Sequence, residues 1–316
     1  MPKLNRRQLL GAGVATAAVL RSSNLLAAEA AAPAPTPAPA AGAAPDVVEV
    51  SGTDRKKMVA AALEALGGIE AFVKKGHRVV LKPNLAFAQP PDFAAGTHPD
   101  ILFAVTEACL KAGAKEVLVA ENPLSDAEKC WTRTGCREAL KGFPEVKLQM
   151  QEEHEQYREV KIPKGLVLKD CEVAKVFLDY DVFISLPQAK HHSSANVSFG
   201  LKSAMGAVWS RKPFHIFMDL QKGIADLGFA VRPHLTILDA VKVLQTNGPK
   251  GPGETTSPNK LFAGRNVVAV DAAALSVCKF DGKVMTLEDA KHIKYAAQHG
   301  LGECDVAKLK IKKVAV

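Results

Sequence analysis

The sequence has few aromatic residues, no closely spaced cysteine pair and no glycine-rich phosphate loop. Three Tyr and two Trp are too few to interleave with a basic surface, which argues against nucleic acid as a partner. None of the six cysteines forms a C-x-x-C pair, so a ferredoxin-type iron–sulfur cluster is not expected. Neither a P-loop nor a G-x-G-x-x-G motif is present, which argues against nucleotide binding. The net charge of +8 therefore indicates a small anionic ligand.

The first 45 residues are typical of a targeting segment and a linker. Residues 1–30 resemble a twin-arginine signal peptide, with Arg6-Arg7 before a short Ala- and Gly-rich apolar stretch. That stretch is too short for a convincing membrane span. Residues 31–45 form an Ala/Pro-rich linker, which favours an extended, solvated chain. We expect export to the periplasm through the twin-arginine (Tat) translocase, and an α/β domain over residues 46–316.

Strand and helix patterns alternate through the rest of the chain. Apolar runs predict strands at 47–50, 78–82, 116–121, 145–151, 160–168, 181–186, 235–239, 266–271 and 309–314. Helical spacing of apolar residues predicts helices over 55–74, 98–110, 213–227 and 286–299. This alternation predicts an α/β fold in which a mostly parallel twisted sheet carries helices on both faces. A small second lobe remains an open alternative.

Polar side chains recur where the predicted strands end. Such residues follow four strands, and on a parallel sheet they would meet at the C-terminal edge, where ligands bind: Lys82 and Asn84, Glu121, Lys190 and His192, and Asp271. The glycine-flanked Lys202 follows Lys190 closely, and lysines at such places suit carboxylate or phosphate recognition. Asn247 and Gly248 open an emphatic turn and are further substrate-binding candidates. Each lone lysine could also be an ordinary solvated residue, and Asp271 a helix cap.

The motifs resemble, in order along nearly the whole mature chain, those of domain-of-unknown-function family 362. The resemblance is carried by short segments spread from residue 82 to residue 271: Lys82-Pro-Asn84, Thr97-x-Pro99, Pro187-x-x-Lys190-x-His192, Gly200-Leu-Lys202, Ile224-Ala-Asp226-Leu227, Arg232-Pro233, Asn247-Gly-Pro249-x-Gly251 and Ala269-Val-Asp271. Two positions depart from the family, because His191 stands where Thr is usual and Ser203 where Asn is usual. The resemblance implies a fold and little agreed chemistry. Some members carry an iron–sulfur module, which this chain lacks.

Three functions are compatible with these residues. The first is an exported, enzyme-like site for a small anion, in which Lys82, Lys190 and Lys202 hold the anion and His192 moves a proton. A transition metal or metal-containing cofactor is an open addition, with Glu121, His192 and Asp271 as ligands. The pattern of histidine, Gly-x-Lys and glycine is similar in outline to lactate racemase-like proteins, which hold a nickel-pincer cofactor. The alternatives are a non-catalytic periplasmic metal- or ligand-binding protein and a redox protein with iron–sulfur partners.

Two cysteines flank a short polar segment. Cys130 and Cys136 enclose Trp-Thr-Arg-Thr-Gly and are candidates for a disulfide in an exported protein. Cys109 and Cys278 lie in apolar patterns and are expected to be core thiols.

Overall fold

The computed structural model describes residues 44–280 and 282–316. The signal peptide predicted at 1–30 and most of the linker predicted at 31–45 lie outside these residues. Within the described part of the chain, no helix has the length and apolarity that a membrane span requires.

The main sheet is mostly parallel. Its strand order is β15-β1-β12-β10-β7-β2-β3-β4, and β10, β7, β2, β3 and β4 run parallel to one another. Only β12 runs against its neighbours along this path. The strands on the path are β1 Val47–Ser51, β2 Arg78–Pro83, β3 Glu116–Glu121, β4 Lys147–Met150, β7 Val182–Leu186, β10 Leu235–Leu244, β12 Lys260–Gly264 and β15 Ile311–Ala315.

Shorter strands extend or flank this sheet. Off its main path, β8 pairs with β10 and β9, and β11 pairs with β10. Two small antiparallel sheets, β5 with β6 and β13 with β14, complete the inventory. Their bounds are β5 Tyr157–Lys161, β6 Asp170–Ala174, β8 Gln188–His192, β9 Asn196–Ser198, β11 Thr255–Thr256, β13 Lys279–Phe280 and β14 Lys283–Val284.

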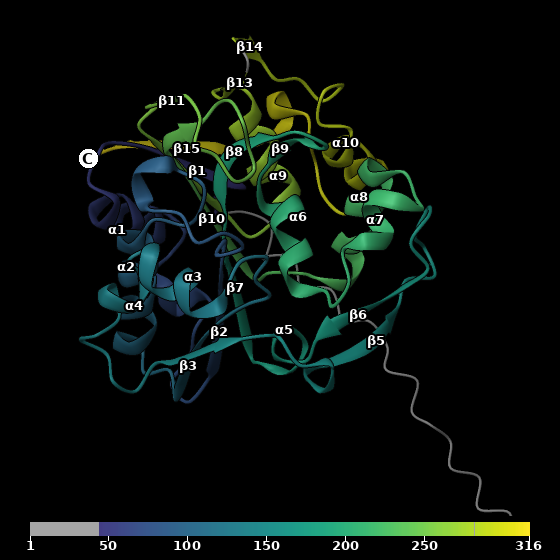
Figure 1. The fold of residues 1–316 in the computed structure, drawn as a ribbon. Helices are drawn as coiled ribbons and strands as arrows, with labels where there is room; N and C mark the ends of the chain where they lie inside the picture. The colour runs from purple at the N-terminus through teal and green to yellow at the C-terminus, as the bar shows by residue number, and fades with distance from the viewer. Residues whose placement is uncertain (1–43, 281) are drawn as a thin grey trace, which may run out of the picture. The chain divides into compact units, whose positions relative to one another are not determined.

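Helices cover both faces of the sheet. Figure 1 shows α1 to α4 on one side of the strands and α6, α7, α8 and α10 on the other. The helices are α1 Arg55–Ala65, α2 Pro99–Lys111, α3 Ala127–Arg133, α4 Cys136–Ala139, α5 Val176–Asp179, α6 Gly200–Ser203, α7 Lys212–Ile216, α8 Leu220–Ala230, α9 Val267–Leu275 and α10 Lys291–Gln298. Five 3₁₀ turns complete them: Ile69–Ala71, Pro91–Phe93, His154–Gln156, Ala204–Ala207 and Val306–Lys308.

Alternate residues of the central strands divide between two apolar cores. On β2, Val79 and Leu81 pack with α1 and α2, whereas Val80 packs with the core on the opposite face. This alternation follows from the two-residue period of a strand. Both faces of the parallel strands are therefore buried, as parallel sheets require. The predicted fold class, an α/β fold with a mostly parallel sheet and helices on both faces, is confirmed.

One predicted strand is wrong. Residues 266–271 begin a helix, α9, whose first turn is capped by the Asn266 side chain accepting from the N–H groups of Val268 and Ala269. Two predicted helices are shorter than expected. The helix predicted over 55–74 ends at Ala65, before Gly67 and Gly68 in the left-handed region, and the one predicted over 286–299 begins at Lys291.

Candidate functional site

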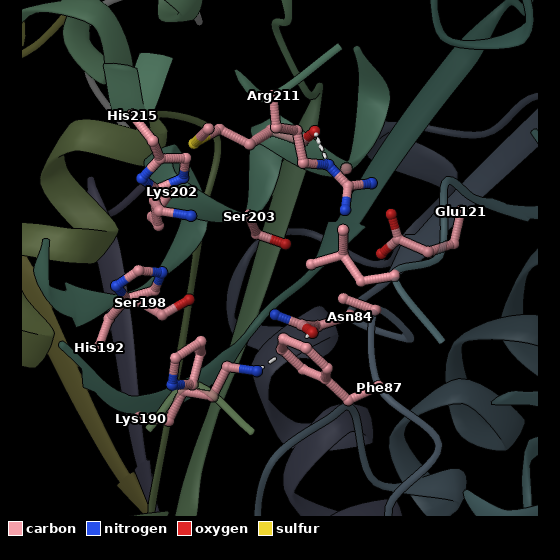
Figure 2. A pocket seen from close by; sticks show the side chains of 15 residues that line it. Asn84, Phe87, Glu121, Lys190, His192, Ser198, Lys202, Ser203, Arg211 and His215 are labelled. Carbon is pink, nitrogen blue, oxygen red and sulfur yellow. Dashed lines mark hydrogen bonds between the residues drawn. The ribbon is translucent and has the colours of Figure 1, made fainter. Parts of the chain in front are cut away.

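A pocket lies beyond the C-terminal ends of the parallel strands (Figure 2). Its empty volume is about 490 Å³, part of which is open to solvent. It is lined by polar and apolar side chains from β3, β8, α6, α7 and the loops beside them: Asn84, Ala86, Phe87, Glu121, Leu124, Lys190, His192, Ser198, Lys202, Ser203, Met205, Gly206, Arg211, His215 and Pro249. The structure therefore brings five of the residues singled out from the sequence to one pocket, namely Asn84, Glu121, Lys190, His192 and Lys202.

Lys82 and Glu121 form a buried ion pair beneath the pocket. The Lys82 ammonium donates to Glu121 Oε2 over 2.9 Å, and both side chains are almost fully buried. Glu121 also accepts from the backbone N–H groups of Leu85 and Asn122. Burial lowers the pKa of Lys82, and the Glu121 carboxylate opposes that shift. Gly206 lies directly over the pair, because a Cβ there would fall 1.9 Å from Glu121 Oε1.

Lys190 donates to neutral acceptors only. Its amino group is hydrogen-bonded to Asn84 Oδ1 at 3.3 Å and to the Ala95 carbonyl, and it lies 5.5 Å from the centre of the Phe87 ring. Burial, followed by the positive charge of Lys202, lowers the pKa of Lys190 to about 7. The side chain is thus placed to release or take up a proton near neutrality.

Lys202 and Ser203 provide donors without protein partners. Among the described residues, the Lys202 amino group has neither an ion pair nor a hydrogen bond, and the buried Ser203 hydroxyl has no partner. Burial, followed by the charge of Arg211, lowers the pKa of Lys202 to about 7. Figure 2 shows both side chains among those that line the pocket. A ligand with acceptor oxygens would satisfy both groups.

Helix α6, which carries Lys202, is held in place by Asp271. The two carboxylate oxygens of Asp271 accept from the backbone N–H groups of Gly200 and Leu201, each over 2.8 Å. Burial raises the pKa of Asp271 to about 7, and the two N–H bonds oppose that shift. Asp271 does not line the pocket, because it lies inside α9 and not at a strand end. It satisfies the free N–H groups at the start of another helix.

His192 is held as a neutral ring. Its Nδ1 accepts from the backbone N–H groups of Ser194 and Ala195 at 3.1 and 3.2 Å, so the ring proton resides on Nε2. Burial, followed by the charges of Lys202 and Lys190, lowers the pKa of His192 to about 2. The ring is parallel to that of His215, with centroids 6.4 Å apart. His192 therefore acts most simply as a hydrogen-bond donor, whereas the sequence analysis expects it to move a proton.

Arg211 is a part of the site that sequence reasoning missed. Its guanidinium donates to the carbonyls of Met205 and Asn122, and burial lowers its pKa. Ser203 was noted only as a departure from the family pattern. Neither residue lies at a strand end, so the strand-end rule gives no signal for them.

Asn247 and Gly248 shape a neighbouring loop and do not line the pocket. The Asn247 side chain donates to the Pro252 carbonyl within its own turn. Gly248 donates its N–H to His191 Nδ1 and accepts from the Ser193 N–H. These bonds hold the loop against β8, and the next residue, Pro249, reaches the pocket wall.

The side chains present do not fit a metal ion held by the predicted ligands. Within residues 44–280 and 282–316, no three His, Cys, Asp or Glu side chains lie together as metal ligands do. A histidine that binds a metal through Nε2 needs its proton on Nδ1, but Nδ1 of His192 faces two N–H donors. Asp271 uses both oxygens on α6. The set of Glu121, His192 and Asp271 is therefore not a metal site in this arrangement.

The cysteines are thiols in this structure. All six are free, and Cys109, Cys130, Cys136 and Cys278 are buried. Burial raises the pKa of Cys136 to about 12. The candidate disulfide between Cys130 and Cys136 is not formed here, and none of the six lines the pocket.

Comparison with known proteins gives one curated relative and two solved structures of similar fold. Thylakoid-associated protein sll1697 of Synechocystis is 26% identical over 232 residues, which cover 69% of this chain and 68% of the relative. The lactate racemase apoprotein of Thermoanaerobacterium thermosaccharolyticum is 15% identical with a TM-score of 0.46, over 69% of this chain and 54% of that one. A Thermotoga maritima protein is 13% identical with a TM-score of 0.42, over 63% of this chain and 54% of that one. The chain spans about half the length of both solved structures.

The family model provides the more extensive match. The family described as "Domain of unknown function (DUF362)" matches residues 79–276, which include every strand of the parallel part of the sheet and every residue that lines the pocket. The chain therefore belongs to the DUF362 family.

Proposed function

We propose that the pocket binds a small anionic molecule in an enzyme-like site. The observation that carries this proposal is the imbalance of charge and hydrogen bonding in its wall. Among the described lining residues Glu121 is the one carboxylate, and it is already paired with Lys82. Lys190, Lys202 and Arg211 contribute the remaining basic groups. The amino group of Lys202 and the hydroxyl of Ser203 have no protein acceptor.

Each side chain has a definite task in this proposal. Lys202 and Ser203 donate to the oxygens of the anion, and Lys190 contributes charge from β8. His192 donates a hydrogen bond from Nε2 to a second oxygen of the ligand, since its Nδ1 is occupied. The Lys82–Glu121 pair forms the floor. His192 is only 6% exposed, which favours a catalytic site closed to water over an open carrier.

Calorimetric titration tests the binding. We expect acetate or glycolate to bind, and acetamide, which has the shape of acetate without its charge, to bind at least tenfold more weakly. Lys202→Met should weaken acetate binding at least tenfold. The matched control is Lys141→Met, because the Lys141 side chain is 77% exposed and lies away from the pocket lining. Equal affinities for acetate in both variants would refute the proposal.

The pH dependence of that binding has a fixed sign. The pKa values of Lys190 and Lys202 lie at about 7 in the empty protein, and a bound anion favours their charged forms. Binding therefore takes up protons, and the affinity for acetate should rise as the pH falls from 8 to 6. Phosphate and sulfate titrations in the same range establish whether a tetrahedral anion competes with the carboxylate.

We propose further that the protein is exported to the periplasm by the twin-arginine route. The support is the sequence alone: Arg6-Arg7, the apolar stretch that follows and Ala28-Glu29-Ala30 as a cleavage site. The test fuses residues 1–45 to a reporter. Replacing Arg6 and Arg7 with Lys should leave the reporter in the cytoplasm. Export that persists in this double variant would contradict the proposal.

A further inference from the structure

We propose that Lys202 forms a covalent imine with the carbonyl carbon of a small oxo acid held in this pocket. This inference rests on the proposed function and names its substrate class. A carboxylate satisfies the basic wall, and a carbonyl group beside it is the second feature of the ligand.

Lys202 is the uncommitted amine of the site. Lys82 is paired with Glu121, and Lys190 donates to Asn84 and to the Ala95 carbonyl. The Lys202 amino group has no such partner among the described residues, although it lines the pocket. An amine that is held by nothing else can approach a ligand atom without first breaking a hydrogen bond.

The surroundings of Lys202 also supply a neutral amine. Burial, followed by the charge of Arg211, lowers its pKa to about 7, so a large fraction is unprotonated at neutral pH. A neutral amine has the free lone pair that attack on a carbonyl needs, and a neighbouring cation is a known way of activating a lysine. Exposed lysines, with pKa values of about 10.4, remain almost fully protonated at that pH.

The step balances without an added reagent. The lone pair of Lys202 Nζ attacks the carbonyl carbon, a C–N bond forms, and the carbonyl oxygen takes a proton to become a carbinolamine hydroxyl. This hydroxyl leaves as water, and the C=N bond replaces the C=O bond. Both hydrogens of the neutral amine end in the water released. The Nε2–H of His192 and the hydroxyl of Ser203 line the same pocket and can stabilise the developing oxyanion.

Reductive trapping tests the imine. The full-length protein is incubated at pH 7 with glyoxylate or pyruvate and cyanoborohydride, and the modified peptides are identified by mass spectrometry. We expect one adduct, on Lys202, formed at least tenfold faster than any adduct on Lys141. The rate should rise between pH 6 and 8 as the amine loses its proton. A purely structural role of Lys202 would give no such profile.

Lys202→Arg separates charge from nucleophilicity, because the guanidinium keeps its charge and does not form the imine. The adduct should be lost in this variant, and its persistence on another residue would overturn the assignment to Lys202. Wild-type protein that binds acetate but gives no Lys202 adduct would overturn the covalent inference alone. Failure to bind acetate as well would overturn the proposed function with it.

Discussion

Lys202 and Lys82 are both lysines in low-exposure surroundings, yet they differ in what opposes the loss of water. Lys82 has the Glu121 carboxylate at 2.9 Å, whereas Lys202 has Arg211 and Lys82 as its main charged neighbours. A charge buried without a partner destabilises the folded state, and one that is paired becomes costly mainly when its partner is removed. The same substitution at the two positions should therefore have opposite effects.

The first prediction follows from this contrast. Lys202→Met should raise the melting temperature at pH 6, because folding no longer requires an unpaired cation in the pocket wall. The pKa of Lys202 is lower in the folded state, so its unfavourable contribution is complete below about pH 7 and disappears as the pH rises toward the unfolded value. The gain of the variant should therefore shrink between pH 7 and 10, as measured by calorimetry at several pH values.

Lys82→Met is the matched substitution. It leaves the Glu121 carboxylate buried without its cation, and breaking a buried pair in this way costs about 3–5 kcal/mol. Its melting temperature should fall. Two variants that shift in the same direction would show that the pairing of Lys82 does not distinguish the two sites.

The second prediction concerns Gly206. A methyl group at this position would lie 1.9 Å from Glu121 Oε1 and 2.5 Å from Lys82 Nζ, so Gly206→Ala forces the ion pair to move. Overpacking of this kind costs about 1–3 kcal/mol. Urea denaturation should show that loss, together with weaker acetate binding. Gly142→Ala is the control, since a Cβ at Gly142 has no atom within 4 Å, and it should change neither property.

Much of the site could be predicted at the level of single residues. Lys82, Asn84, Glu121 and the Lys190–His192 segment follow strand ends, and the parallel sheet brings strand ends together. Ser203 could not be found in this way, because its position depends on how Asp271 holds α6. The state of His192 was equally hidden, since it is set by two backbone N–H groups from the following turn.

At the scale of elements, α6 is a four-residue helix that depends on another helix for its cap. The side chain of Asp271 on α9 satisfies two of its free N–H groups. The helix positions Lys202 and Ser203 at the pocket, so a loose cap should disturb the ligand without touching it. Asp271 is a positioning residue in this sense.

The third prediction tests that role. Asp271→Ala leaves two buried N–H groups unsatisfied, each at a cost of about 1–3 kcal/mol, and should weaken acetate binding as well. The control is Asp54→Ala, which removes two comparable bonds at the start of α1, to Lys56 and Lys57. That variant should lose stability and keep its affinity for acetate. A loss of affinity in both variants, or in neither, would contradict a specific link between α9 and the pocket.

The misassigned element shows why sequence periodicity failed there. Residues 266–271 read Asn-Val-Val-Ala-Val-Asp, an apolar β-branched run of strand length. In α9 every residue from Val268 to Leu275 is buried, so the helix has no polar face to reveal a helical period. A fully buried helix and a fully buried strand look alike over six residues. The Asn266 cap and the Ala272–Ala274 run were the remaining signals for a helix.

At the scale of the whole molecule, the alternation of strands and helices was enough to predict the parallel sheet and its two covered faces. It did not predict how β10 joins the site to the sheet. β10 pairs with β7 at Leu235 and Thr236, and with β8, the strand of Lys190 and His192, from Asp239 to Leu244. Its other edge is covered by β12 and β11. These pairings involve residues far apart in the sequence, which local patterns do not encode.

Because β10 has neighbours along both edges, its amide hydrogens should be among the last to exchange with deuterium oxide. The two halves of the strand should nevertheless respond differently to a ligand. An anion that steadies β8 through Lys190 should slow exchange at residues 239–244, while residues 235–236, which pair with β7, keep their rates. The strand would then report occupancy of the pocket along its own length, as a boundary between amides that sense the ligand and amides that do not.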